Sequence, residues 1–296
     1  MRDILVTGGS GQVGGALVRL GAPEGFRLIA PPRAELDLAD PASIVGFVAS
    51  RPWAAVINAG AYTAVDRAEA DVEAAWRINA LAPACLAKVA AEAGIPIIHV
   101  STDYVFPGDL DRPYREDDPI GPLGVYGASK EGGEQAVRTG NSRHAIVRTS
   151  WVVSAHGGNF IKTMLRLGAD RDVLRVVADQ HGAPTAAADL AGVLALIAQR
   201  MIADPAAPVG TFHFANAGAT TWAGFAAEIF SLSAARCGPS AKVEPIATKD
   251  YPTPARRPGN SRLDLQRIRD LHGVQPRAWE LAIADIIDEL IPPRAP

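Results

Sequence analysis

The first half of the chain alternates short apolar runs with longer stretches of helical periodicity. Because the runs are continuously apolar, each is expected to form a strand that is buried on both faces of a parallel sheet. This order of elements predicts an α/β fold with a doubly wound parallel sheet over residues 1–150. The predicted strands are Ile4 to Val6, Arg27 to Ala30, Ala54 to Asn58, Ile95 to Val100 and His144 to Arg148.

Specific residues mark the ends of two predicted helices in this half. Asp40 is a good N-cap, and Pro41 suits the first helical position after it. An alanine-rich stretch from Asp71 to Ala93 is predicted to be one helix that ends at Gly94.

After Trp151 the pattern loosens into helix-like stretches between loops that contain proline and glycine. Residues 151–296 are therefore predicted to be mostly a smaller C-terminal, substrate-binding lobe, from which strands or helices can return to the first domain. The cleft between the two parts is the expected ligand site. The helices predicted in this lobe are Phe160 to Leu167, Leu190 to Met201, Trp222 to Leu232 and Trp279 to Leu290.

Composition and charge exclude several classes of protein. Of the 296 residues, 48% are hydrophobic and 21% are charged, which is ordinary globular usage and excludes a disordered or fibrous chain. A net charge of -3 provides no basic stripe for a phosphate backbone, so no nucleic-acid partner is expected. The chain begins with a strand and has no apolar run near the roughly 20 residues of a membrane span, so we expect a cytoplasmic protein that is not bound to a membrane.

Cys85 and Cys237 are the only cysteines, and their spacing is typical of neither a zinc site nor a disulfide framework. Both lie in alanine-rich, helix-like surroundings. We therefore predict two reduced, buried thiols.

A glycine-rich turn follows the first strand. Gly8, Gly11 and Gly14 come where a helix should begin. Glycines there allow a tight turn, close approach of the backbone to a pyrophosphate and close helix packing, while free helix N–H groups face the phosphates. An ordinary glycine-rich turn is the alternative, but the strand before it and the helix after it favour a dinucleotide-binding site.

The end of the second strand bears on which dinucleotide binds. No acidic residue stands there to accept a hydrogen bond from a ribose 2′-hydroxyl, whereas Arg33 could meet a 2′-phosphate. NADPH is therefore mildly favoured over NADH, and a solvated surface arginine is the alternative. Asp37 and Leu38 come next and are expected to flank the adenine.

Two further motifs carry candidate chemistry. Tyr126 and Lys130 stand four residues apart, which places both on one face of a helix, where an ammonium lowers the pKa of a nearby phenol. Thr102 directly follows the fourth strand and can there donate a hydrogen bond to a substrate carbonyl. The alternatives are an ordinary surface helix and a threonine that closes a turn. We predict that Tyr126 is the proton donor of this set.

With these motifs assembled, the chain resembles the extended short-chain dehydrogenase/reductases and, among them, the family of dTDP-4-dehydrorhamnose reductases. The resemblance covers nearly the whole chain. The motifs in the second lobe are the specific ones, since the glycines alone would fit many oxidoreductases. The matching segments are residues 11–14, 58–59, 63–66, 101–106, 148–151, 159–160, 179–185 and 251–258.

The resemblance implies a Rossmann domain and an NAD(P)H-dependent oxidoreductase. Its expected reaction is hydride transfer to C4 of dTDP-4-dehydro-L-rhamnose, a dTDP-linked 6-deoxy-4-ketohexose, to give dTDP-L-rhamnose, a nucleotide-sugar precursor of cell-surface polysaccharide. Thr102 would bind the growing oxyanion and Tyr126 would protonate it. Lys130 would tune the phenol and hold the nicotinamide ribose.

The resemblance also extends the set of expected site residues. Asp103, Tyr104 and Trp151 would line the sugar pocket together with Thr102 and Tyr126. Residues 256–257 and 260–262 either help to hold the nucleotide or have plain structural roles. The residues expected along the cofactor are Gly8, Gly11, Gln12, Val13, Gly14, Arg33, Asp37, Leu38, Ala59, Ala61 and Tyr62.

Rival functions remain open to different degrees. Nucleotide-sugar dehydratases share these motifs but need a carboxylate at the position of Tyr104, which counts against elimination of water. A related nucleotide-sugar 4-ketoreductase, or a cofactor-binding regulatory subunit without turnover, is not excluded by the sequence. His99 and His181 are expected to satisfy local hydrogen bonds instead of taking part in catalysis.

Some members of the resembled family form a magnesium-bridged dimer through three glutamates. The corresponding positions here are Ala16, Ala188 and Glu289. One carboxylate cannot build the oxygen-rich shell that magnesium requires, and Asp189 should face elsewhere on its helix. We therefore expect no metal, and either a monomer or a metal-independent homodimer.

Overall fold

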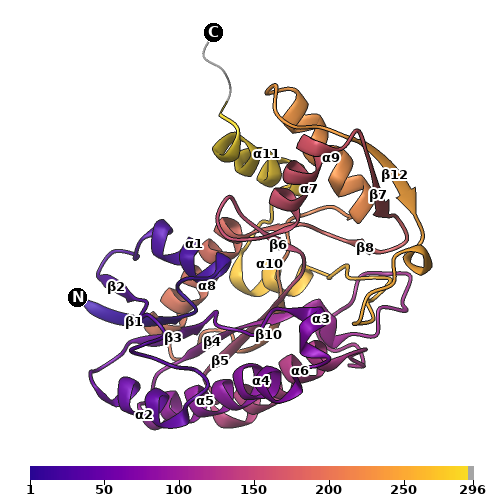
Figure 1. The fold of residues 1–296 in the computed structure, drawn as a ribbon. Helices are drawn as coiled ribbons and strands as arrows, with labels where there is room; N and C mark the ends of the chain where they lie inside the picture. Colours follow the sequence, from indigo (N-terminus) through magenta and orange to yellow (C-terminus); the bar gives the residue numbers. More distant parts are fainter. Residues whose placement is uncertain (293–296) are drawn as a thin grey trace.

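A six-stranded sheet forms the centre of the first half of the chain in the computed structural model, which describes residues 1–292 (Figure 1). Residues 293–296, the end of the predicted second lobe, lie outside the described residues. The strand order is β10-β5-β4-β3-β1-β2, and every neighbouring pair is parallel. The doubly wound fold is confirmed, as are the five predicted strands, which are β1 (Arg2–Thr7), β2 (Phe26–Ile29), β3 (Ala55–Asn58), β4 (Ile97–Thr102) and β5 (His144–Thr149).

Helices cover both faces of this sheet (Figure 1). One apolar core packs α2 (Pro41–Ala49), α5 (Ala82–Glu92) and α6 (Val125–Gly140) against one face. A second core packs α1 (Gln12–Leu20), α8 (Ala187–Ala203) and α10 (Gln266–His272) against the other. Burial on both faces explains why the strands are continuously apolar.

Part of the second half of the chain returns to this sheet. β10 (Gly210–His213) pairs with β5, and α8 packs beside α1. The helix predicted from Leu190 to Met201 is confirmed as α8. The sequence pattern does not predict β10, because Phe212 is the only large apolar side chain in its four residues.

The alanine-rich stretch after Asp71 is not one regular α-helix. It runs as α4 (Val72–Trp76), a π-helical turn η1 (Arg77–Leu81) and α5. Asn79 in the π turn accepts a hydrogen bond from the Tyr62 N–H at 2.8 Å, so the wider turn is held by a neighbouring loop. The prediction of a single helix is wrong in this respect, whereas its end at Gly94 is confirmed by a φ of +67°.

The remaining helices form the second lobe around a separate apolar core. α7 (Phe160–Asp170), α9 (Trp222–Ala234) and α11 (Trp279–Leu290) pack together there, as their periodicity predicts. β7 (Val173–Val177) pairs in parallel with β12 (Lys242–Ile246) beside them. The shorter elements are α3 (Val65–Ala68), η2 (Asp103–Val105), β6 (Val152–Val153), β8 (His181–Gly182), β9 (Thr185–Ala186), β11 (Thr220–Thr221) and η3 (Thr248–Asp250). Within residues 1–292, no helix has both the length and the apolar character needed to span a membrane.

The two cysteines are less buried than predicted. Cys85 is half-buried on α5, and Cys237 is exposed. The prediction is wrong for Cys237 because α9 ends at Ala234, and the cysteine then lies in a turn with a φ of +57°.

Candidate active site

The glycine turn between β1 and α1 has the geometry of an anion-binding loop. The Gly11 N–H donates to the Gly8 carbonyl at 2.9 Å, and Gly11 is the N-cap of α1. A Cβ at Gly14 would overlap the Gly8 carbonyl oxygen, and Gly8 itself has a φ of +70°, so both positions require glycine. No acidic side chain lies in the first turn of α1, so the positive end of the helix is free to face a phosphate. These residues fit the pyrophosphate of a dinucleotide.

A buried polar chain shapes the loop after β3, which carries the predicted cofactor residues Ala59 and Ala61. The Thr7 hydroxyl donates to Asn58 Oδ1 at 2.6 Å and accepts the Gly60 N–H at 3.1 Å. Asn58 Nδ2 in turn lies 3.0 Å from His99 Nδ1, so the expectation that His99 satisfies a local hydrogen bond is confirmed. Thr7 and Asn58 stand at strand ends, but no local pattern in the sequence reveals their contact.

Other predicted cofactor residues lie around this loop. Gln12 reaches the second lobe, where its Nε2 donates to the Val152 carbonyl at 3.3 Å and its Oε1 accepts from Asn159 at 3.0 Å. Val13 packs against the apolar core under α1. The Tyr62 hydroxyl donates to Asp71 at 3.1 Å, and burial raises the pKa of that phenol.

Arg33 and Asp37 stand together beyond β2. Arg33 is 76% exposed, and its guanidinium lies 3.4 Å from the Asp37 carboxylate. The Ala39 N–H also donates to this carboxylate at 2.9 Å and, together with Arg33, lowers its pKa despite some burial. Leu38 follows directly, and its side chain lies against Gly60.

Thr102, Tyr126 and Lys130 meet at the carboxyl end of β4. Thr102 is the last residue of the strand and is 6% exposed, and its hydroxyl donates to Asp103 Oδ1 at 3.0 Å. Tyr126 lies in the first turn of α6, and its ring meets that of Tyr104, two residues after Thr102, edge to face. Lys130 is one turn further on, and its Nζ donates to the Val100 carbonyl at 2.6 Å. The structure therefore brings the three predicted side chains to one place.

The electrostatics of this set differ from the expectation. Burial raises the pKa of Tyr126 to about 12, and the opposing contribution comes from the Thr102 hydroxyl instead of from Lys130. Burial also lowers the pKa of Lys130 to about 8, while the Glu134 carboxylate acts to raise it. The expectation that Lys130 lowers the pKa of the phenol is therefore wrong for this structure, because burial dominates the pKa of Tyr126 and Lys130 is not among the groups that shift it.

A buried ion pair continues the helix face below Lys130. Glu134 accepts two hydrogen bonds from Arg148, at 2.8 and 2.7 Å, and both side chains are at most 1% exposed. Arg148 lies on β5, so the pair fixes α6 against the sheet beside Thr102 and Lys130. Sequence reasoning placed Arg148 in a matching motif but gave it no partner.

Asp103 and Tyr104 extend the set toward the second lobe. Asp103 is 3% exposed and its Oδ2 has no partner within residues 1–292, and burial raises its pKa to about 6. The Tyr104 ring meets the Tyr126 ring edge to face, with 5.5 Å between centroids, and burial raises the pKa of its phenol.

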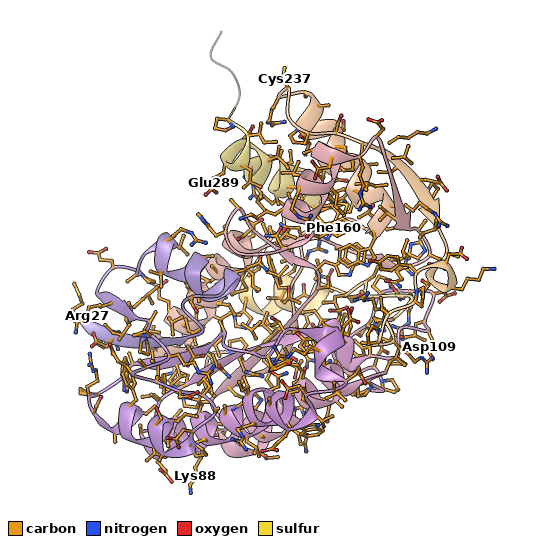
Figure 2. All side chains as sticks on the ribbon, viewed as in Figure 1. Arg27, Lys88, Asp109, Phe160, Cys237 and Glu289 are labelled. Atoms are coloured by element: carbon orange, nitrogen blue, oxygen red, sulfur yellow. The ribbon has the colours of Figure 1, made fainter. Side chains whose placement is uncertain are left out.

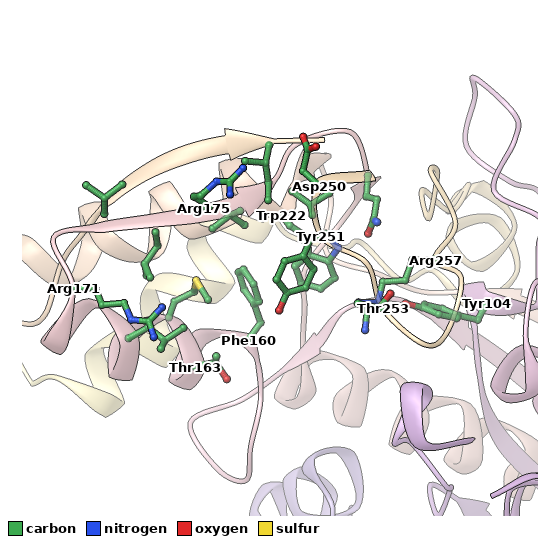
Figure 3. Close-up of a pocket in the computed structure, with 18 residues that line it drawn as sticks. Tyr104, Phe160, Thr163, Arg171, Arg175, Trp222, Asp250, Tyr251, Thr253 and Arg257 are labelled. Atoms are coloured by element: carbon green, nitrogen blue, oxygen red, sulfur yellow. The ribbon is translucent and has the colours of Figure 1, made fainter. Parts of the chain in front are cut away.

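A cavity of about 760 Å³ opens beside Tyr104 in the second lobe (Figure 3). Aromatic side chains and three arginines line it, and sequence reasoning missed most of them because they come from segments far apart in the chain. The aromatic members are Tyr104, Phe160, Trp222 and Tyr251, and the arginines are Arg171, Arg175 and Arg257. Figure 3 shows Tyr104 and Arg257 together at one end and Arg171 at the other.

Trp151 lies behind this cavity instead of lining it. Its indole stacks on Trp222, with 3.7 Å between ring centroids and 16° between planes. Its φ of +47° is a left-handed conformation, which costs a side-chain-bearing residue about 1–3 kcal/mol. Strain of this kind is typical of functional sites.

The loop of residues 256–262 contributes one arginine to the cavity wall and one asparagine to a structural contact. Arg257 lines the cavity and pairs with Asp66 at 2.8 Å, which ties the second lobe to the segment after β3. Asn260 instead donates to the carbonyls of Leu110 and Arg112 at 2.8 and 2.7 Å, which is a structural role. The side chain of His181 is exposed, and its backbone pairs with Asn260.

The three positions compared with a magnesium site carry one carboxylate. Glu289 pairs with His156 at 3.0 Å, while Ala16 and Ala188 have no ligand atom in their side chains. Asp189 pairs with Arg277 at 2.8 Å. In the part of the chain that the structure describes, no group of three or more His, Cys, Asp or Glu side chains is placed to hold a metal ion.

A glycine turn that fits a dinucleotide pyrophosphate and a helix that carries Tyr126 and Lys130, both placed by one parallel sheet, are typical of an extended short-chain dehydrogenase/reductase. Comparison with known proteins narrows this class. The family described as RmlD substrate binding domain matches residues 1–291. The chain belongs to this family, that of the dTDP-4-dehydrorhamnose reductases.

Named relatives agree with this assignment along the whole chain. A dTDP-4-dehydrorhamnose reductase from Sinorhizobium fredii is 41% identical over 278 residues, which are 94% of each chain. The crystal structure of such a reductase from Clostridium acetobutylicum is 36% identical with a TM-score of 0.91, covering 97% of this chain and 99% of that one. A third, from Bacillus anthracis and in complex with NADP, is 33% identical with a TM-score of 0.90, covering 98% and 100%.

Proposed function

We propose that this chain reduces the C4 keto group of dTDP-4-dehydro-L-rhamnose with a nicotinamide cofactor and releases dTDP-L-rhamnose, a precursor of cell-surface polysaccharide. The observation that carries the proposal is the position of Thr102 and Tyr126. Tyr126 contacts Tyr104, which lines the cavity of the second lobe. Thr102 ends β4 at the carboxyl edge of the sheet, the same edge at which the glycine turn follows β1. Residues 1–150 would hold the cofactor, and most of the remaining chain would hold the sugar nucleotide.

Thr102 and Tyr126 are the proposed donors to the keto oxygen. A bound nicotinamide supplies the hydride. The hydroxyl of Thr102 would turn from Asp103 to the carbonyl oxygen of the sugar, and the phenol of Tyr126 would give that oxygen its proton. With a pKa of about 12, the phenol keeps its proton at neutral pH, as an acid in the reductive direction must.

Lys130 has a proposed role in orientation. Its Nζ holds the Val100 carbonyl at 2.6 Å and has further donors to offer the nicotinamide ribose. The buried pair of Glu134 and Arg148 would keep the helix that carries it in place.

The cavity beside Tyr104 is the proposed site of the dTDP moiety. Arg171, Arg175 and Arg257 supply positive charge for a diphosphate, and Phe160 and Tyr251 supply faces for a base. Such a cavity, of about 760 Å³, is in the size range of small-molecule sites.

NADPH is the proposed preferred cofactor. Arg33 is 76% exposed beyond β2 and can leave Asp37 for a 2′-phosphate. Replacing Arg33 by alanine should raise KM for NADPH and leave KM for NADH unchanged. Equal effects on the two cofactors would contradict this assignment.

We further propose that turnover needs no added divalent metal, and that the chain is a monomer or a homodimer formed without metal. The single carboxylate at the three compared positions, already paired with His156, supports this. A cytoplasmic location stays a prediction of the sequence.

A spectrophotometric assay separates the proposed function from its rivals. Purified protein mixed with NADPH and dTDP-4-dehydro-L-rhamnose should consume NADPH. A cofactor-binding regulatory subunit would bind NADPH without consuming it, and a dehydratase would release water from a dTDP-hexose with no net consumption. Either result would overturn the proposal.

A further inference from the structure

Trp151 is held in an unusual conformation by neighbours distant in sequence. It follows β5 with a φ of +47°, one of two positive values at non-glycine positions within residues 1–292. The Thr185 N–H donates to its carbonyl at 3.1 Å, and the Ser150 hydroxyl donates to the Ala183 carbonyl at 3.0 Å. The backbone therefore directs the indole into the second lobe.

Two residues, Trp222 and Gly182, pack against the Trp151 indole. The ring of Trp222 stacks on it at 3.7 Å and 16°, and a Cβ added to Gly182 would lie 2.6 Å from its ring atoms. The pairing of β8 with β11 brings them together, since Gly182 lies opposite Thr220, two residues before Trp222. The Trp151 indole thus fits into this space because Gly182 has no side chain and Trp222 offers a flat ring.

Trp222 also belongs to the wall of the large cavity. It lines that cavity with Phe160, whose ring centroid lies 4.7 Å from its own (Figure 3). The Trp222 indole therefore contacts both the cavity proposed for the nucleotide and Trp151, which is expected beside the sugar.

We propose that Trp222 is a positioning residue for substrate binding, which holds the Trp151 indole by ring stacking while Gly182 leaves room for it. This role rests on the proposed function, in which Trp151 lies beside the sugar. Trp222 acts on the sugar through Trp151 and takes no part in proton transfer.

Kinetics of three variants test the proposal. Trp222→Ala should raise KM for the dTDP-ketosugar about three- to tenfold, the usual worth of an aromatic pair, with kcat nearly unchanged and Kd for NADPH unaltered. Trp222→Phe, which keeps a flat ring, should recover most of the loss. Gly182→Ala should raise KM in the same way with Trp222 intact, because its methyl group displaces the Trp151 indole.

Trp53→Phe is the matched control for the kinetics, since Trp53 precedes β3 at the amino edge of the sheet, opposite the candidate site, and should leave all constants unchanged. An unchanged KM in Trp222→Ala, or an equal loss in Trp222→Phe, would overturn the role of stacking. So would a loss of kcat with unchanged KM.

Far-ultraviolet circular dichroism tests the pair independently of activity. Two stacked indoles couple their transitions, so the exciton signal should vanish in both Trp222→Phe and Trp151→Phe and persist in Trp76→Phe. Persistence of the signal in Trp222→Phe would overturn the proposed pairing. If wild-type protein failed to reduce the ketosugar but showed this signal, the proposed function would fail while the pairing stood, and the positioning role would then be withdrawn.

Discussion

Replacing Asp103 by asparagine tests the energetics of the buried carboxyl beside Thr102. The side chain is 3% exposed, and Oδ1 accepts the Thr102 hydroxyl at 3.0 Å. Burial raises its pKa from 3.8 to about 6, so the carboxyl is ionised at neutral pH at a cost to the folded state. Asparagine has nearly the same shape, can still accept from Thr102 and cannot ionise.

The magnitude follows from the pKa values of the folded and unfolded states. Their difference of about 2 corresponds to about 3 kcal/mol, at about 1.4 kcal/mol for each pKa unit. The folded state binds this proton more tightly than the unfolded chain does. Binding of the proton by Asp103 therefore contributes its whole stabilising effect to the free energy of unfolding below pH 3.8. This effect is lost as the pH rises through about 6. Asp103→Asn should thus be more stable than wild type by up to about 3 kcal/mol at about pH 8, and by little at about pH 4.

Urea unfolding of both proteins at the two pH values gives this difference directly. Asp172→Asn is the matched control, because Asp172 is exposed in the second lobe and should show no such gain. A stability difference that did not change with pH, or a variant less stable than wild type at about pH 8, would show that ionised Asp103 does not destabilise the folded state.

Four other perturbations have clear expected outcomes. Tyr126→Phe should lower kcat by about 10²- to 10⁴-fold with Kd for NADPH unchanged, and a variant that kept more than about a tenth of the rate would indicate another proton donor. Thr102→Val should lose much more activity than Thr102→Ser, and equal rates would mean that the hydroxyl does not touch the reacting carbonyl. Gly14→Ala should weaken NADPH binding measured by calorimetry, because its methyl group would overlap the Gly8 carbonyl; an unchanged Kd would argue against the phosphate loop. Treatment with EDTA should change neither turnover nor the mass measured by light scattering, and a loss of both that magnesium restores would show that other carboxylates bind a metal.

The sheet and the meeting of Thr102, Tyr126 and Lys130 at its edge could be predicted because their signals are local. A buried parallel strand is continuously apolar, and the four-residue spacing of Tyr126 and Lys130 suffices to put both on one helix face. The position of Thr102 follows from where β4 ends. Each of these inferences depends on residues close together in the chain.

Features that depend on packing between distant segments could not be predicted. The stacking of Trp151 on Trp222 and the pairing of Asp66 with Arg257 join residues 71 and 191 positions apart. The pKa of Tyr126 was expected to fall and is raised, because the four-residue spacing reveals the lysine on the same helix face but not the burial that raises the pKa.

Transfer of a labelled hydride directly tests whether the protein reduces C4 of the ketosugar. The protein would be incubated with dTDP-4-dehydro-L-rhamnose and NADPH that carries deuterium at the transferable position of the nicotinamide, and the product examined by NMR. The expected product is dTDP-L-rhamnose with deuterium at C4 and nowhere else. Deuterium at another carbon, the C4 epimer as the main product, or no transfer by correctly folded protein would contradict it.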